Sequence, residues 1–180
     1  LAEYASGTNR DAVVQKALTL ADSLSIAVTR GELHGLSSAL VGSVLVAERR
    51  FDEARALLEF SKSLECKYVL FHLFLSLERP DMSEKVMRDM NGVDADDILS
   101  QLAFAHLALV AGHDKAHEAF LALSEMISKY TATPLLLNLL AIAQMKLGRW
   151  DDAHSTLLEA LEKVFFVVFV RAGSCETSGW

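Results

Sequence analysis

Residues 149–153 read Arg-Trp-Asp-Asp-Ala, and residues 50–54 read Arg-Phe-Asp-Glu-Ala, 99 residues earlier. In both copies a leucine follows four residues after the alanine, as Leu58 and as Leu157. An aromatic residue, two acids and a small residue suit the start of a helix that crosses its neighbour closely. The acids would face the positive end of the helix dipole, which is worth about 0.3–1 kcal/mol for each charge. The recurrence therefore predicts a repeated helix pair.

Two intermediate copies fill the gap between these segments. Their small residues are Ser83 and Ala119, and Met87 and Leu123 follow four residues later. From Ala54 onward the spacings are 29, 36 and 34 residues, close to the period of about 34 of tetratricopeptide repeats. We therefore predict an all-α fold, a right-handed tetratricopeptide-like helical-repeat solenoid. An irregular helical bundle whose repeat is accidental is the alternative.

The structural repeat positions carry the packing in this interpretation. They are Phe51, Ala54, Leu58, Ser83, Ala119, Leu123, Gly148, Trp150, Ala153, Leu157 and Ala160. The aromatic residue is expected to fill the gap between the two helices of a pair. Trp150→Ala should then cost about 3–5 kcal/mol, as large-to-small core substitutions do.

Apolar residues recur at helical spacing from a first stripe, between Val13 and Leu24, almost to the end of the chain. Thr133-Pro134 predicts an N-cap followed by proline in the first helical turn. Gly112 and Gly148 are expected where helices end in a left-handed residue. The array is predicted over residues 1–163 and is expected to be incomplete at both ends.

Residues 164–180 are expected to be an atypical tail, and the alternatives are a disordered segment, an artefact of the gene model and a genuine short isoform. It opens with the apolar heptapeptide Val-Phe-Phe-Val-Val-Phe-Val. This heptapeptide could extend the last helix, form a strand or drive aggregation.

Composition excludes several classes of protein. Apolar residues make up 52% of the 180 residues, and disorder of the whole chain needs low hydrophobicity and high charge. The net charge is −7, and no basic cluster larger than Arg49-Arg50 is present to neutralise nucleic-acid phosphates. The longest conspicuous apolar run has seven residues, whereas a membrane-spanning helix needs about 20. We predict no nucleic-acid partner and no direct membrane insertion.

Few residues suggest catalysis or a cofactor. His113 and His117 have a spacing found in metal sites, but no third ligand follows at a characteristic distance. The acidic run from Asp94 to Asp97 lacks the Gly and Glu of a calcium loop and is interpreted as a helix start. Cys66 and Cys175 are far apart and indicate no disulfide framework, so Cys66 is expected to be a small packed residue. We predict no enzyme activity, no metal and no cofactor.

Several short motifs, in this order and spacing, point to one family. They are Ser63-Leu64-Glu65-Cys66, Leu77-Glu78-Arg79-Pro80-Asp81-Met82, Gln101-Leu102-Ala103, Thr133-Pro134-Leu135-Leu136-Leu137-Asn138, Gly148-Arg149-Trp150 with Ala153, and Leu157-Leu158-Glu159-Ala160-Leu161. The chain resembles the epsilon subunit family of coatomer, the coat of Golgi-derived vesicles, from about Leu1 to Lys163. Each motif alone is weak, whereas their shared order is specific.

The resemblance implies a scaffold that clasps the carboxyl-terminal region of the alpha coatomer subunit. It implies a cytoplasmic protein, peripherally associated with Golgi membranes and coated vesicles, in Golgi-to-endoplasmic-reticulum retrograde and intra-Golgi transport. The alternative is a tetratricopeptide-like adaptor or co-chaperone of another multiprotein complex.

In such arrays the first helix of each pair lines the partner groove. The candidate groove residues are Leu102, His106, Leu109, Leu135, Asn138, Ile142 and Met145. Residues 98–110 contain no Lys or Arg, whereas gripping the acidic end of a peptide needs charge-assisted donors. The pattern favours a broad apolar interface with a folded partner or a helix.

Overall fold

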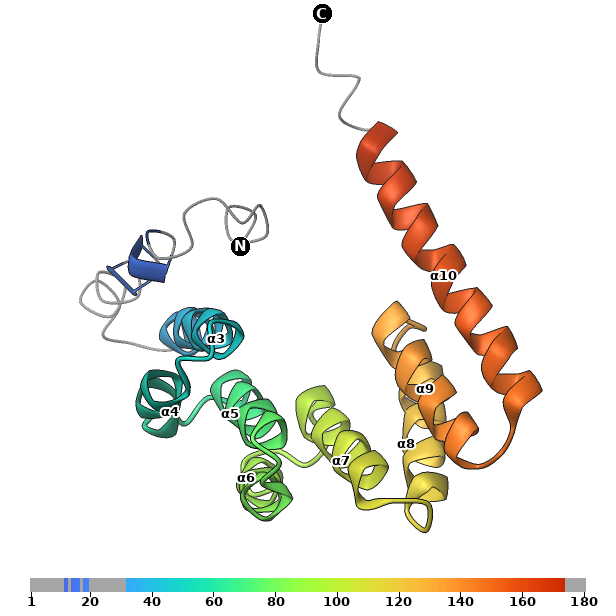
Figure 1. Ribbon diagram of the computed structural model, residues 1–180, viewed down its shortest axis with the longest axis horizontal. Helices are drawn as coiled ribbons and strands as arrows, with labels where there is room; N and C mark the ends of the chain where they lie inside the picture. The colour runs from blue at the N-terminus through green and yellow to red at the C-terminus, as the bar shows by residue number, and fades with distance from the viewer. Residues whose placement is uncertain (1–11, 13, 17, 20–31, 174–180) are drawn as a thin grey trace, which may run out of the picture. The chain divides into compact units, whose positions relative to one another are not determined.

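The computed structural model of the chain describes residues 12, 14–16, 18–19 and 32–173 (Figure 1). Most of the predicted first stripe, from Val13 to Leu24, lies outside these residues. The described elements are α3 (Glu32–Ala47), α4 (Phe51–Glu59), α5 (Leu64–Ser76), α6 (Pro80–Asn91), α7 (Ile98–Ala111), α8 (Ala116–Lys129), α9 (Pro134–Lys146) and α10 (Trp150–Gly173). The described part contains no strand, and the prediction of an all-α helical-repeat fold is confirmed.

The chain divides into two compact units, Leu1–Ala103 and Phe104–Trp180, and the boundary falls inside α7. In the first unit α5 is central, because it packs against α3, α4 and α6. In the second unit α9 packs against both α8 and α10. In both units these helices pack against helices close to them in the chain, as repeat architectures do.

One turn geometry recurs between the two helices of three pairs. Arg49, Glu78 and Gly148 have φ values of 61°, 56° and 73°. The next backbone N–H donates to the carbonyl oxygen five residues earlier, always at 2.9 Å: Arg50 to Leu45, Arg79 to Phe74 and Arg149 to Gln144. This bond is the signature of the Schellman motif, which satisfies a free carbonyl at a helix end. The three turns therefore show the repeat in the backbone itself.

Predicted helix ends are confirmed at two glycines and one cap. Gly112 and Gly148 have φ values of +117° and +73°, where side-chain-bearing residues are strained. Thr133 accepts a hydrogen bond on its Oγ1 from the Leu136 N–H at 3.3 Å, and Pro134 is the first residue of α9. These signals could be read from the sequence because each satisfies a local backbone requirement.

The small repeat residues lie where helices cross closely. Ala54, Ser83, Ala119 and Ala153 are each no more than 2% exposed. At the polar member of the set, the hydroxyl of Ser83 lies 3.4 Å from the carbonyl oxygen of Phe71 in α5 and 3.2 Å from that of Arg79, and it can donate to either oxygen. The site thus accepts serine without leaving its hydroxyl unsatisfied.

The prediction that the Trp150 ring fills an interhelical gap is wrong, because the residue is 65% exposed. Ala153 and Ala160 are buried on α10, and at 3.6 residues per turn Trp150 lies roughly 60° around the helix from Ala153. Among the described helices α10 packs against α9 alone, so only a narrow stripe of α10 is covered. Leu157, at the edge of the same stripe, is 39% exposed.

Trp150→Ala is consequently expected to change the free energy of unfolding by less than about 1 kcal/mol, as most surface substitutions do. Urea denaturation followed by circular dichroism checks this. A loss of several kcal/mol would show that the indole is packed in solution.

Helix α10 continues through residues 164–170 to Gly173. Of the three alternatives for the apolar heptapeptide, its backbone takes the helical extension. Near the start of this extension, Lys163 donates from Nζ to the carbonyl oxygen of Ala132 at 2.8 Å and pairs with Glu159 at 3.2 Å. The hydrogen bond to Ala132 ties the middle of α10 to the loop that precedes α9.

Candidate interaction surface

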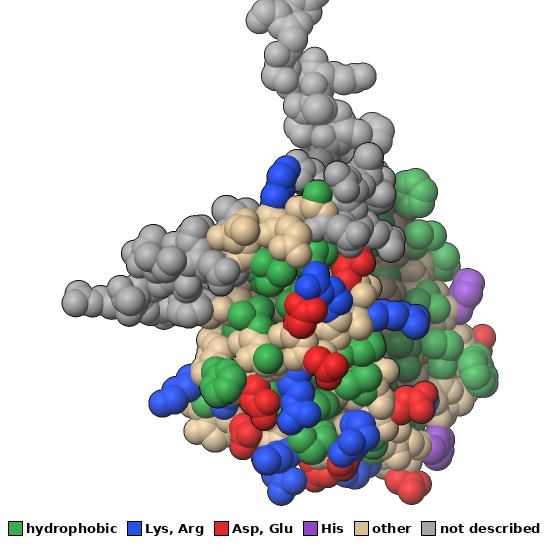
Figure 2. All heavy atoms as spheres, turned by 60° about the vertical axis from the view of Figure 1, so that its left-hand side comes forward, with side chains coloured by type: hydrophobic (Ala, Val, Ile, Leu, Met, Phe, Trp, Pro, Cys, Tyr) green, Lys and Arg blue, Asp and Glu red, His purple; other side chains and the backbone are tan. Residues whose placement is uncertain are grey.

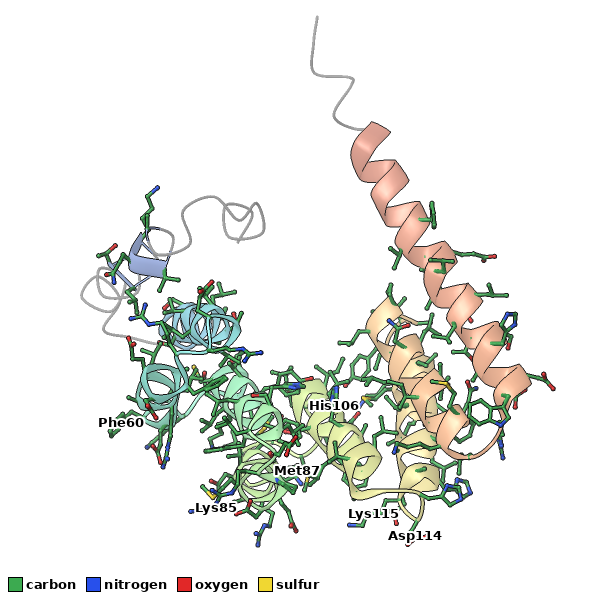
Figure 3. All side chains as sticks on the ribbon, in the orientation of Figure 1. Phe60, Lys85, Met87, His106, Asp114 and Lys115 are labelled. Atoms are coloured by element: carbon green, nitrogen blue, oxygen red, sulfur yellow. The ribbon has the colours of Figure 1, made fainter. Side chains whose placement is uncertain are left out.

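One face of α9 is exposed although the helix has neighbours on two other sides. Leu135, Asn138 and Ile142 are exposed and Met145 is half-buried, at spacings of three, four and three residues. Such spacings place side chains on one helix face. Figure 3 shows α9 and its neighbours α8 and α10 with their side chains. The four predicted groove residues of α9 therefore form an uncharged face, apolar except for Asn138, that is open to a partner.

The predicted groove residues of α7 lie differently. Leu102 and Leu109 are buried, and His106 is half-buried. The large apolar residues that α7 exposes are Phe104 and Val110. Sequence reasoning missed both, because a helix that is apolar all round gives no polar face from which its orientation can be inferred.

Helix α10 presents an exposed apolar face that sequence reasoning also missed. Its members are Leu157, Leu158, Leu161, Val164 and Phe165. The sequence signal for this face is the large number of apolar residues in α10. A helix that packs against one neighbour needs only a narrow apolar stripe, and α10 has more apolar residues than that. Contiguous exposed apolar side chains of this kind mark interaction surfaces in soluble proteins.

The turns that join the helix pairs are electrostatically balanced. Arg50 donates to Glu53 at 2.8 and 2.6 Å, and Arg79 donates to Asp81 at 3.0 and 2.9 Å. These hydrogen bonds lower the pKa of the Glu53 and Asp81 carboxyls. Both pairs are solvent-exposed and contribute little to stability. Their role is to neutralise arginines that sit beside the positive ends of helix dipoles.

Aromatic groups cluster along α5. The Tyr68 ring meets His72 edge-on at 4.6 Å and lies 6.3 Å from the ring of Phe71. Burial raises the pKa of Tyr68 to about 12, because the low-polarity surroundings disfavour the phenolate. Tyr68 therefore contributes a neutral, half-buried phenol to this helix at physiological pH.

In the described part of the chain, the histidines and acids that the sequence suggests as metal ligands are not grouped into a metal site. In the described ranges, no group of three or more His, Cys, Asp or Glu side chains is placed to hold a metal ion. Asp97 accepts from the Leu99 N–H at 2.8 Å, which confirms the interpretation of the acidic run as a helix start. The thiol of Cys66 is buried and donates to the carbonyl oxygen of Gly35 at 3.2 Å, as expected of a packed residue.

None of the helices in the described part of the chain has the length and apolar character needed to cross a membrane.

Comparison with known proteins identifies the family. The sequence model of a family described as Coatomer epsilon subunit matches residues 1–165. The chain belongs to the coatomer epsilon subunit family. The resemblance carried by the ordered motifs is thereby confirmed.

Three curated members of the family give the extent of the match. The chain is 32% identical over 163 residues to coatomer subunit epsilon-1 of Oryza sativa subsp. japonica, covering 91% of the chain and 55% of the relative. It is 33% identical over 124 residues to coatomer subunit epsilon-1 of Arabidopsis thaliana, covering 69% and 42%. With coatomer subunit epsilon of Dictyostelium discoideum it shares 29% identity over 166 residues, covering 91% and 54%. The chain spans about half the length of the curated relatives it matches.

Proposed function

We propose that this chain is a structural scaffold subunit of the coatomer vesicle coat, and that it binds and stabilises the carboxyl-terminal region of the alpha subunit. The observation that carries the proposal is the family match over residues 1–165. The role belongs to Golgi-to-endoplasmic-reticulum retrograde and intra-Golgi transport. The chain would act on the cytoplasmic side of Golgi membranes, held there through the other coat subunits.

The exposed face of α9 supports binding through apolar contact. Leu135 and Ile142 offer aliphatic surface, and Asn138 between them offers hydrogen-bonding groups without charge. Interface cores are depleted in charged residues, so this face suits a folded partner better than a charged peptide end. A co-chaperone of the type that grips carboxylates needs Lys or Arg at such positions, and this face has none.

Binding to the alpha subunit tests the proposal. We expect Ile142→Asp to weaken capture of the carboxyl-terminal region of the alpha coatomer subunit of the same organism by at least about tenfold, because a buried unpaired carboxylate costs more than 1.4 kcal/mol. The measurement is a quantitative pull-down with the chain as written. Leu121→Asp is the matched control, because Leu121 is an exposed leucine on α8.

Two outcomes would count against the assignment. Equal capture by the Ile142→Asp and Leu121→Asp variants would show that the exposed face of α9 is not a specific part of the interface. If the unmodified chain fails to bind, and a longer chain with a family-like carboxyl-terminal extension also fails, the adaptor hypothesis replaces the coat hypothesis.

A further inference from the structure

A groove runs between α4 and α6 in the first unit, and α5 forms its floor. The residues that line it are Leu58, Glu59, Ser61, Lys67, Leu70, Phe74, Met82, Lys85, Val86 and Asp89. Its volume is about 110 Å³, somewhat smaller than the roughly 150 Å³ of an engineered cavity that holds benzene. The groove is therefore large enough for much of one aromatic side chain.

The floor and the rim of the groove differ in character. Leu70 and Phe74 of α5 form an apolar floor, and Leu58 of α4 adds a third buried apolar side chain beside it. On one wall lies Met82, a flexible and polarisable side chain that adapts its shape to a neighbour. Such a site accepts an apolar group and gains little from a polar one.

Beside this groove stands a phenylalanine with almost no protein contact. Phe60 is 89% exposed and lies between Glu59 and Ser61, which both line the groove. It closes the carboxyl end of α4, and Figure 3 shows it on α4 and Lys85 on α6. Burying a phenylalanine side chain contributes about 1.5–3 kcal/mol of favourable free energy, which an exposed ring does not gain. The surface thus carries an aromatic knob next to a hole of nearly matching size.

The rim carries both signs of charge in equal number. Lys67 and Lys85 oppose Glu59 and Asp89. Lys67 donates to the backbone carbonyl oxygen of Asp89 at 3.2 Å, and Glu59 pairs with Arg55 at 3.3 Å. Figure 2, which turns the left-hand side of Figure 1 forward, shows both charge types interspersed with hydrophobic side chains. A balanced rim does not repel a second copy of itself, whereas a rim of one sign would.

We propose that two copies of this chain associate about a two-fold axis, with Phe60 of each inserted into the α4–α6 groove of the other. A two-fold interface uses the same patch on both copies, which requires the phenylalanine and the groove to lie close together. Glu59 and Ser61, the chain neighbours of Phe60, both line the groove, so Phe60 lies at its edge. The contact is small, so the dimer is weak and forms at high local concentration. This self-association is independent of the proposed coat function, and either can fail without the other.

Sedimentation velocity over a wide range of protein concentration tests the proposal. We expect the unmodified chain to form a reversible dimer and Phe60→Ser to weaken it by at least about tenfold, because buried aromatic anchors dominate interface energies. Val93→Ser is the matched control, because Val93 is an exposed apolar residue of the same unit outside the groove. It should leave the dimer unchanged.

A second variant tests the hole independently of the knob. Met82→Trp fills the groove and should also abolish the dimer, with its fold checked by circular dichroism. Phe60→Ser retains the groove and Met82→Trp retains the knob, so mixing them should restore one contact and give a weaker heterodimer. A chain that stays monomeric at every concentration would overturn the proposal and leave the groove to a different protein. A dimer unaffected by Phe60→Ser, or a mixture that restores nothing, would overturn it as well.

Discussion

Replacing Phe71 by alanine is expected to lower the free energy of unfolding by about 3–5 kcal/mol. Phe71 is fully buried on α5, the helix that packs against α3, α4 and α6. Because helices surround the ring on several sides, the cavity left by the substitution cannot close by a small shift of one of them. The loss is a large share of the 5–15 kcal/mol that typically stabilises a domain.

Urea denaturation followed by circular dichroism measures the loss. Hydrogen exchange resolved by peptide then assigns it to α5 and its neighbours. Phe60→Ala is the matched control, since it removes the same ring from an exposed position of the same unit. The control should change stability by no more than about 0.5 kcal/mol when measured at low protein concentration. Similar losses in the two variants would contradict the central packing of Phe71.

The small residues of the repeat could be predicted because their requirement is local. Ala54 and Ala153 must let two consecutive helices approach, whatever lies beyond the pair. The exposure of Trp150 could not be predicted in the same way, since it depends on how many other helices cover the pair. Motif similarity between Phe51 and Trp150 carries no information about those further neighbours, and Phe51 is half-buried whereas Trp150 is exposed.

The repeated turn shows a second limit of sequence reasoning. Gly148 could be predicted to adopt a positive φ because glycine does so without steric cost. Arg49 and Glu78 occupy the same place in their turns, but a side chain in this region costs roughly 1–2 kcal/mol and is not expected from residue type. Alignment of both turns with Gly148-Arg149 was the only available signal, and it is visible once the period is known.

For the candidate surface, polarity decided what could be predicted. On α9 the polar Asn138 marks the exposed face, and Leu135 and Ile142 share it. On α7 the sequence from Ile98 to Ala111 is apolar on nearly every side, so its burial depends on contacts distant in sequence. The partner-binding role of these positions stays a prediction until binding is measured.

Leu58 and Leu157 occupy the same position of the repeat, four residues after the small alanine, but their truncation is expected to differ in effect. Leu58→Ala should cost about 2–5 kcal/mol, because Leu58 is fully buried and α4 packs against both α3 and α5. Leu157→Ala should cost less than about 1 kcal/mol, because that side chain is 39% exposed. The same urea titration compares them. Equal losses would mean that repeat position, and not the number of neighbouring helices, sets the energy.

A second substitution shows whether the Leu58 cavity is the cause of the loss. A Cβ atom added to Gly42 of α3 would lie 2.7 Å from Cδ2 of Leu58, so Gly42→Ala forces a buried side chain to move in the unmodified protein. In the Leu58→Ala background that obstacle is gone, and the methyl group fills part of the cavity. Alanine also favours the helix by about 1 kcal/mol over glycine. Gly42→Ala should therefore stabilise Leu58→Ala by about 1 kcal/mol or more, and the two changes should be non-additive by about 0.5–3 kcal/mol, as for residues in direct contact. Strict additivity would instead place the cost of Leu58→Ala away from the α3–α4 crossing.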